Sequence, residues 1–341
     1  MRYLSNFAVM INERKNVILA LVVSIIAALF LSSTFTINSL LAHTGSYWAW
    51  TACLRSLFMI PIMIVPLWIC KGLRPLLHTL TSYSGLFIKW GIIGFGGLYT
   101  CVALASLFIP GWLVAATFQI NILAGLLLSP IIYQDHRKKI PYRALLLSAF
   151  IVAGVLVMQL DKMSQLHDIK SLSVSFLLVL IGAIVWPLAN RKLLLDLDHR
   201  GVHLNATQRV LGLTIGCLPL LLLLAAYAYY QVGFAPVLQL KASFYSALFS
   251  GFIGGVCFYQ ATQMVKHHPV ALATVEATQV FEIFFTLIGE IWLIGAALPK
   301  VYGLLGMSMI LIGMTVQISY TLRQSRERSF PLIAKENNSG I

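Results

Sequence analysis

The sequence has few charged residues, and few of these are acidic. Only 10% of the 341 residues are Asp, Glu, Lys or Arg, and just 11 of them are Asp or Glu. Hydrophobic residues make up 59% of the chain, and the mean hydropathy is +0.86. Such a composition excludes an ordinary soluble domain and predicts an all-α integral membrane protein that contacts the lipid bilayer. No nucleic-acid-binding module is visible.

The motifs of catalysis and metal binding are also lacking. The sequence contains no HExxH, no paired Asp motif, no Ser with a His at matching depth and no ATP-binding loop. We therefore predict that the protein is not an enzyme and not an ATP-driven pump. The five cysteines show no CxxC or Cys/His spacing and fall within apolar runs, where they are interpreted as packing residues. No cofactor, metal or disulfide is expected.

Apolar runs long enough to cross a bilayer, about 20 residues each, are the main feature that is present. We predict ten spans, at residues 17–41, 48–70, 86–108, 112–132, 144–160, 172–189, 210–230, 244–265, 268–293 and 301–322. The first run is too long for a signal-peptide core and has no clear cleavage site, so it is interpreted as a retained span.

Lys and Arg are distributed unequally between the loops. If the N-terminus is cytoplasmic, 19 of the 24 lie in cytoplasmic segments, 4 on the opposite side and Arg55 within a span. The positive-inside rule then predicts a multi-pass protein of the cytoplasmic (inner) membrane with both termini in the cytoplasm. Nine or eleven spans would remove this asymmetry.

Five features recur in the same order in the two halves of the chain. They are residues 37–41 with 189–194, Arg55 with Arg209, Gly94-Phe95-Gly96-Gly97 with Gly251-Phe252-Ile253-Gly254-Gly255, Pro110 with Pro269, and the stretch from Pro141 to Gln159 with that from Pro299 to Gln317. Because each half has five spans, the halves are predicted to be inverted relative to each other, an architecture of transporters. The predicted division is a cytoplasmic N-terminus (1–16), a first repeat (17–160), an extracytoplasmic linker (161–171), a second repeat (172–322) and a cytoplasmic basic tail (323–341).

These residues resemble the drug/metabolite transporter superfamily, in its ten-helix EamA-like branch. The pattern consists of an Arg in the second span of each half, a Pro before the fourth span of each half, Gly289-Glu290 closing the ninth span, and Gly303, Gly306 and Gly313 in the tenth. Residues 17–322 are covered, and the group they look most like is that of multidrug-resistance efflux transporters. The resemblance implies a transporter. One departure is that the first and sixth spans offer Asn38 and Asn190, where the small four-helix multidrug transporters use a first-helix glutamate.

The ninth run carries three carboxylates, Glu276, Glu282 and Glu290, together with Gln279. A charge at membrane depth costs a few kcal/mol on insertion scales, so it marks a functional site by default. At about 100° per residue, most of these polar residues share one face of a helix. Glu282 lies near the bilayer centre and is predicted to bind substrate or protons. For Glu276 binding and structural roles are left open, and Glu290 is interpreted as structural.

Further polar and aromatic residues are candidates to line a central cavity between the halves. They are Gln119, Asn121, Asn38, Asn190, Trp186, Tyr259 and Tyr99. The alternative for each amide is an interhelical hydrogen bond. Gln119 and Asn121 in the fourth span are the symmetry counterparts of the Glu276–Gln279 region. Gly303 and Gly306 are predicted to pack the tenth span against the fifth. We also predict two ion pairs, Arg55 with Glu290 and Arg209 with Glu276. These pairs would be either gates or static contacts that neutralise a buried charge.

The sequence therefore favours a secondary active transporter that exports small organic solutes or drugs by alternating access. Its substrate would be amine-bearing or cationic, and proton coupling is left open. The alternatives are an uncoupled facilitator or exchanger of amino acids or other metabolites and, less favoured, a lipid-intermediate flippase or a scaffolding subunit. The expected assembly is a monomer or a homodimer.

Overall fold

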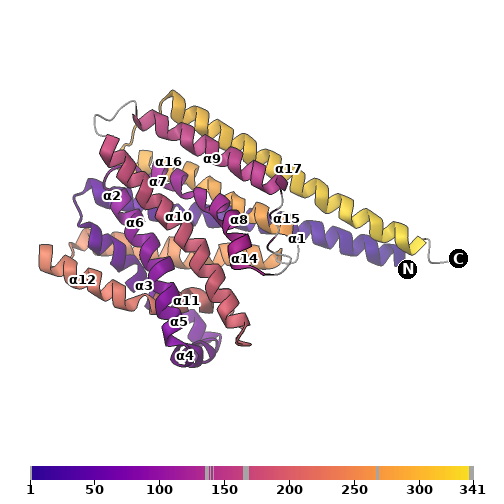
Figure 1. The fold of residues 1–341 in the computed structure, drawn as a ribbon, viewed down its shortest axis with the longest axis horizontal. Helices are drawn as coiled ribbons and strands as arrows, with labels where there is room; N and C mark the ends of the chain where they lie inside the picture. The colour runs from indigo at the N-terminus through magenta and orange to yellow at the C-terminus, as the bar shows by residue number, and fades with distance from the viewer. Residues whose placement is uncertain are drawn as a thin grey trace.

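The computed structural model describes residues 2–134, 138, 140, 142–163, 169–265 and 269–337 as a bundle of helices (Figure 1), with no strand among these residues. The first half contains α1 (Arg2–Leu31), α2 (Ser33–His43), α3 (Trp48–Ile69), α4 (Leu73–Ser82), α5 (Ser84–Trp90), the π-helix η1 (Gly91–Gly96), α6 (Gly97–Ala105), α7 (Gly111–Phe118), α8 (Ile120–Ile132) and α9 (Tyr142–Met163). The second half contains α10 (Ile169–Asp198), α11 (Ala206–Gly216), α12 (Leu218–Val232), α13 (Val237–Ser246), the π-helix η3 (Ala247–Gly254), α14 (Gly255–Met264), α15 (Pro269–Ala277), the 3-10 turn η4 (Thr278–Val280), α16 (Phe281–Ile294) and α17 (Val301–Asn337).

The apolar runs are helical, as their length and composition predict. Among the described residues, eight helical segments are long and apolar enough to cross a membrane, and the pair α11 and α12, bent by 47°, makes a ninth. The remaining run is a shorter apolar helix, Leu145–Leu160, within α9. The prediction of an all-helical, multi-span membrane protein is confirmed, whereas the count of ten crossings stays a prediction.

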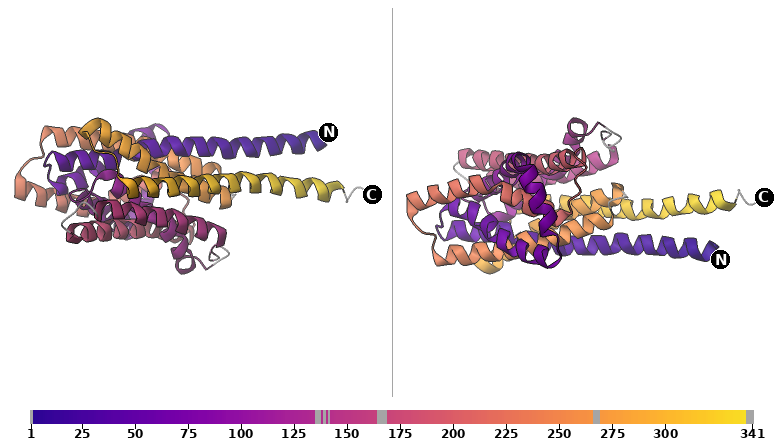
Figure 2. Two further views of the ribbon diagram at one scale, coloured as in Figure 1. Left: turned by 90° about the horizontal axis from the view of Figure 1, so that it is seen from above. Right: turned by 90° about the horizontal axis from the view of Figure 1, so that it is seen from below.

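Both termini lie at one end of the bundle, which we call the terminal end. Figure 2 shows α1 and α17 leaving the bundle together at this end. α17 continues without a break to Asn337, well beyond the predicted end of the tenth span at residue 322. The basic tail therefore begins as a helix that extends the last span. Residues 164–168 of the predicted linker, and His267 and His268 before the ninth run, lie outside the described residues.

The start of α11 illustrates how local sequence sets an element. Asn205 accepts the backbone N–H of Gln208 at 2.8 Å, and the Gln208 side chain accepts the Asn205 N–H at 2.8 Å. This reciprocal pair is a capping box, which satisfies two N–H groups at a helix start. The Gln208 amide also donates to the Gly72 carbonyl at 2.7 Å. This hydrogen bond joins the second span of the first half to the second span of the second half, near the terminal end.

Glycines allow the helices to cross at close range. α9 packs along α17, where a Cβ on Gly306 would lie 2.4 Å from the Gly154 carbonyl oxygen. The predicted packing of the tenth span on the fifth is confirmed by this crossing. The two glycine-rich motifs of the third and eighth spans form the π-helices η1 and η3. A π-helical segment inside an α-helix is uncommon and often marks a functional region.

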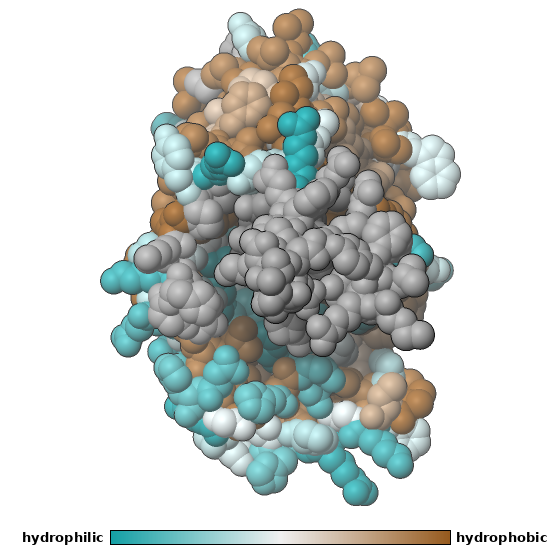
Figure 3. All heavy atoms as spheres, turned by 90° about the vertical axis from the view of Figure 1, so that its right-hand side faces the viewer, coloured by the Kyte–Doolittle hydropathy of each residue, from teal (hydrophilic) through white to brown (hydrophobic). Residues whose placement is uncertain are grey.

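Figure 3 views the terminal end directly. Hydrophobic residues cover its upper part, where α9 and α17 lie in Figure 1, and hydrophilic residues gather in its lower part, around α4. Exposed basic residues in this region include Arg74 on α4 and Arg200 after α10. A hydrophilic, basic end beside an apolar flank is the surface expected where a bundle leaves the bilayer.

Candidate functional site

The ninth run is not one regular helix, because the 3-10 turn Thr278–Val280 separates α15 from α16. Such a turn advances about 120° per residue instead of about 100°, so it rotates the faces of α16 relative to α15. Three such residues rotate α16 by about 60° relative to α15, which shifts the predicted polar stripe without excluding it. Glu282, Thr286 and Glu290 follow one another at four-residue spacing on the buried face of α16, and Glu276 belongs to a separate helix.

The fourth run has a local break in its α-helix at the corresponding position, although residues Gly111–Ile132 form one helical segment. α7 ends at Phe118 and α8 begins at Ile120, so Gln119 is the junction. Gln119 is fully buried, and its Nε2 donates to the carbonyl oxygens of Ala115 and Gln279, each at 3.2 Å. The fourth and ninth runs therefore contact each other at their irregular turns. The sequence identified Gln119 as the counterpart of the polar residues of the ninth run, and the structure brings its side chain into contact with the Gln279 carbonyl.

Gln119→Leu is expected to lower the free energy of unfolding by about 1–2 kcal/mol, because a buried interhelical hydrogen bond is lost at nearly constant volume. Chemical denaturation of the purified protein in detergent measures the change. The matched control is Gln263→Leu, since Gln263 is exposed on α14. Equal midpoints for the two variants would contradict the structural role of Gln119.

Glu282 is the buried carboxyl group without a partner. Its exposed fraction is 3%, and its carboxyl group makes no hydrogen bond or ion pair within the described part of the chain. One turn further, the Thr286 hydroxyl donates to the Ser32 carbonyl of the first run at 3.5 Å, which places this face of α16 against α1 and α2. An isolated buried carboxylate is costly, so the group is compensated by a proton or by a cationic ligand.

Glu290 has a different environment from the one predicted. Its two carboxylate oxygens accept the backbone N–H groups of Gly111 at 2.7 Å and Trp112 at 2.9 Å, and the residue has no exposed surface. A carboxylate at a helix start satisfies N–H groups that have no intrahelical partner and interacts favourably with the helix dipole. Glu290 therefore anchors α7 to α16. The predicted pair with Arg55 is absent, which corrects that prediction.

Arg55 lies elsewhere in the interior. Its Nη2 donates to the Ser250 hydroxyl at 2.9 Å, and its guanidinium carbon lies 4.1 Å from the centre of the Tyr99 ring. The Ser250 hydroxyl also hydrogen-bonds the Thr34 hydroxyl. Ser250 was not a candidate in the sequence, since a lone serine in an apolar run carries no signal of its own.

The second predicted ion pair, Arg209 with Glu276, is also absent. Arg209 makes no ion pair within the described residues, and its buried Nε has no partner. The cation that acts electrostatically on Glu276 is Arg191 of α10. Arg191 donates from Nη1 to the Gly125 carbonyl and, at 2.9 Å, to the Ser129 hydroxyl, both on α8. In the sequence, Arg191 is counted only among the basic residues of the cytoplasmic segments.

The remaining candidates lie at separate places in the bundle. Asn190 donates from Nδ2 to the Tyr259 hydroxyl at 3.5 Å, so these two predicted residues are brought together. Trp186 stacks edge-on against Phe118, with ring centres 6.2 Å apart, beside the broken fourth run. Asn38 and Asn121 are buried on α2 and α8.

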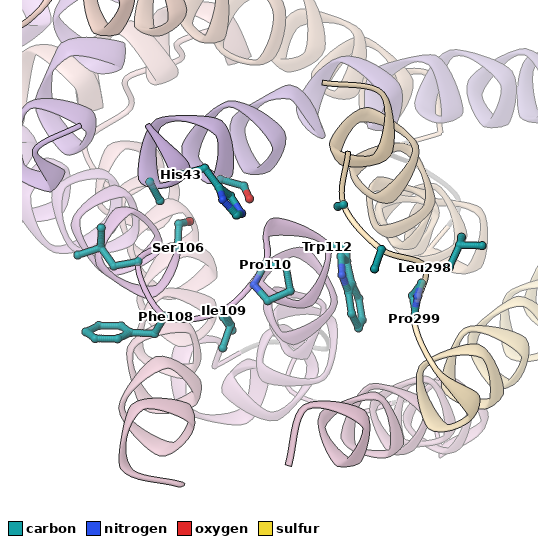
Figure 4. Close-up of a pocket in the computed structure, with 13 residues that line it drawn as sticks. His43, Ser106, Phe108, Ile109, Pro110, Trp112, Leu298 and Pro299 are labelled. Carbon is teal, nitrogen blue, oxygen red and sulfur yellow. The ribbon is translucent and has the colours of Figure 1, made fainter. Parts of the chain in front are cut away.

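A concavity of about 400 Å³ opens at the end of the bundle away from the termini. Figure 4 shows His43, Ser106, Pro110, Trp112 and Leu298 around it. Pro110 and Trp112 at the start of α7 line this concavity. The same helix start is bound by Glu290 through the N–H groups of Gly111 and Trp112. Trp112 therefore both lines the concavity and binds Glu290 through its backbone N–H group.

A multi-span helical bundle with irregular turns inside its fourth and ninth runs, and a buried carboxyl group unpaired among the described residues beside them, resembles the sites of membrane transporters. The chain belongs to the family described as "Putative multidrug resistance efflux transporter" (EmrE), whose sequence model matches residues 18–323. The resemblance seen in the sequence is confirmed, and membership identifies a transporter of the drug/metabolite type.

Two relatives share most of this chain. "Uncharacterized protein YjlA" of Bacillus subtilis (strain 168) is 38% identical over 304 residues, which cover 86% of this chain and 93% of the relative. "Uncharacterized 42.1 kDa protein in intracellular alkaline protease 3'region" of Shouchella clausii is 33% identical over 272 residues, covering 78% and 70%. Among solved structures, one described as "Crystal structure of protein" superposes with a TM-score of 0.59 at 15% identity, over 89% of this chain and 97% of that chain, and shows the fold alone.

Proposed function

We propose that the protein is a secondary active transporter that exports small organic solutes or drugs across the cytoplasmic membrane by alternating access. Its ten predicted spans would form two inverted five-helix halves, with both termini in the cytoplasm. Support comes from paired irregularities: η1 and η3 lie in the third span of each half, and the breaks at Gln119 and Thr278–Val280 lie in the fourth. Irregular helices at midplane are where transporters place their sites.

The observation that carries the proposal is the unpartnered carboxyl group of Glu282. Because it is buried beside the junction of the broken helices, it can exchange a proton for an amine-bearing or cationic solute without breaking a structural contact. Exchange at one group that faces each side in turn is the minimal requirement for coupled antiport. Glu276, half-buried and under the influence of Arg191, is a secondary candidate for the same exchange.

Closure at the two ends of the bundle would rest on contacts other than the ion pairs first expected. At the end away from the termini, Glu290 holds α7 against α16. Nearer the terminal end, Arg191 joins α10 to Gly125 and Ser129 of α8. Both contacts link different halves of the chain. We propose that they loosen in alternation as the halves rock.

The test uses purified protein in liposomes that contain a pH-sensitive dye, with an imposed gradient of the fluorescent cation ethidium. The native protein is expected to couple ethidium movement to proton flux in the opposite direction. The double variant Glu282→Gln, Glu276→Gln is expected to abolish proton flux, because neither side chain can then release a proton. The single variants assign the effect to one residue or the other.

Asp198→Asn is the matched control, since it removes an exposed carboxylate at the end of α10 and should leave the flux unchanged. Proton flux that persists in the double variant would exclude the coupled mechanism. Solute movement without any proton flux in the native protein would instead favour the uncoupled facilitator. The two outcomes are distinguished by measuring both fluorescence signals in the same vesicles.

A further inference from the structure

Arg55 is a buried cation for which the described residues supply no counter-charge. Its exposed fraction is 4%, and its Nε and Nη1 atoms are fully enclosed without a hydrogen-bond partner. A guanidinium group has five N–H donors. Only Nη2 is engaged, by the Ser250 hydroxyl, and the Tyr99 ring covers one face of the group.

The nearby carboxylates do not neutralise this charge. Glu290, the predicted partner, uses both oxygens on the start of α7. Among the described residues no carboxylate lies within ion-pair distance of Arg55. Leaving a buried charge uncompensated costs several kcal/mol, whereas a hydrogen-bonded pair with an anion recovers much of that cost. The charge of Arg55 therefore does not contribute to the stability of the fold in this conformation.

The surroundings hold the guanidinium group in a defined orientation. Ser250 on η3 is itself fixed by the hydroxyl of Thr34 on α2, and Tyr99 comes from α6. The group is therefore held by three different helices, while Nε and Nη1 have no hydrogen-bond partner among the described residues. Planar guanidinium donors match the two oxygens of a carboxylate, and a fixed group loses little entropy on binding.

We propose that Arg55, with Tyr99 and Ser250, binds an anionic group, most simply a carboxylate, of the transported solute. The inference rests on the proposed transport function and narrows its substrate class. The solutes are organic carboxylates or zwitterions, with the carboxylate at Arg55.

The experiment measures equilibrium binding to the purified full chain with three planar probes of the same shape. They are benzoate (anionic), benzamide (neutral) and benzamidine (cationic), titrated in detergent and followed by thermal shift. Benzoate is expected to stabilise the native protein. Benzamide is expected to bind with an affinity at least about tenfold lower, because a neutral group forms no charge-assisted pair. Arg55→Gln should remove this preference, and Arg55→Lys should retain part of it.

Lys241→Gln, which removes an exposed cation on α13, is the charge-matched control and should keep the benzoate preference. If Arg55→Gln does not fold, the comparison of benzoate with benzamide in the native chain and in Arg55→Lys still decides. The proposal is overturned if benzoate fails to bind, binds no better than benzamide, or binds Arg55→Gln as it binds the native protein.

This binding test needs no gradient and no transport, so its outcome is separable from that of the proposed function. Arg55-dependent benzoate binding without any solute movement in liposomes would remove the transport proposal and keep the anion site. If the protein instead couples cation export to proton flux but does not distinguish benzoate from benzamide, the transport proposal stands and the anion site is excluded.

Discussion

Replacing Glu290 with alanine is expected to lower the free energy of unfolding by about 3–5 kcal/mol. Two buried hydrogen bonds to a charged acceptor are lost, each with a net value of about 1.5–3 kcal/mol, and the N–H groups of Gly111 and Trp112 are left without partners. Glu290→Gln should have a smaller effect, since the amide oxygen still accepts one N–H group. Thermal and chemical unfolding in detergent measure both changes.

The control for Glu290 is again Asp198→Asn, an exposed carboxylate whose loss should change the unfolding midpoint little. A second comparison separates the anchor from the ion pair first predicted. If Glu290 paired with Arg55, the effects of Arg55→Gln and Glu290→Gln on the free energy of unfolding would not be additive in the double variant. The structure predicts additive effects, because the two side chains contact different helices.

Replacing Gly91 with alanine is expected to lower stability by about 3 kcal/mol or more. A Cβ at this position would lie 2.5 Å from the carbonyl oxygen of Leu213 and 2.8 Å from the backbone nitrogen of Cys217. These are backbone atoms of α11 and of the junction to α12, so they cannot rotate away as a side chain would. Inserting a methyl group into such a contact forces the helices apart. Unfolding midpoints and the yield of monodisperse protein report the effect.

Gly85 provides the matched control on the adjoining helix. It lies on α5 six residues before Gly91, is exposed, and has no atom within 4 Å of a built Cβ. Gly85→Ala is therefore expected to be neutral or to stabilise by up to about 1 kcal/mol, through the better helix propensity of alanine. Equal losses in the two variants would contradict the close crossing of η1 and α11.

Much of the fold could be predicted from the sequence, since membrane-spanning helices are set by length and composition. Each of the ten apolar runs is helical in the structure, and the pairing of the fifth run with the tenth followed from their glycines. The breaks at Gln119 and at Thr278–Val280 could not be predicted. Neither stretch contains a proline or glycine at the break, so the irregular turns depend on the contact between the two helices.

The candidate site was predicted in composition but not in its pairings. Glu282, Glu276 and Gln279 were identified because polar residues are rare in apolar runs, and Gln119 was identified as the counterpart of this region. The ion pairs of Arg55 and Arg209 were wrong, because they were matched by depth and sign of charge alone. Depth does not reveal that backbone N–H groups at the start of α7 would satisfy Glu290.

The sequence by itself determined that this protein is an all-helical membrane protein, where its apolar runs lie and which few residues carry charge inside them. These properties depend on the transfer of each side chain between water and lipid, which is local. The tertiary structure alone decided the partners: Glu290 anchors α7, Arg191 reaches α8, and Glu282 and Arg55 have no counter-ion in the described part of the chain. Hydrogen bonds and ion pairs act over a few ångströms in space, between residues that are more than 60 positions apart in the chain.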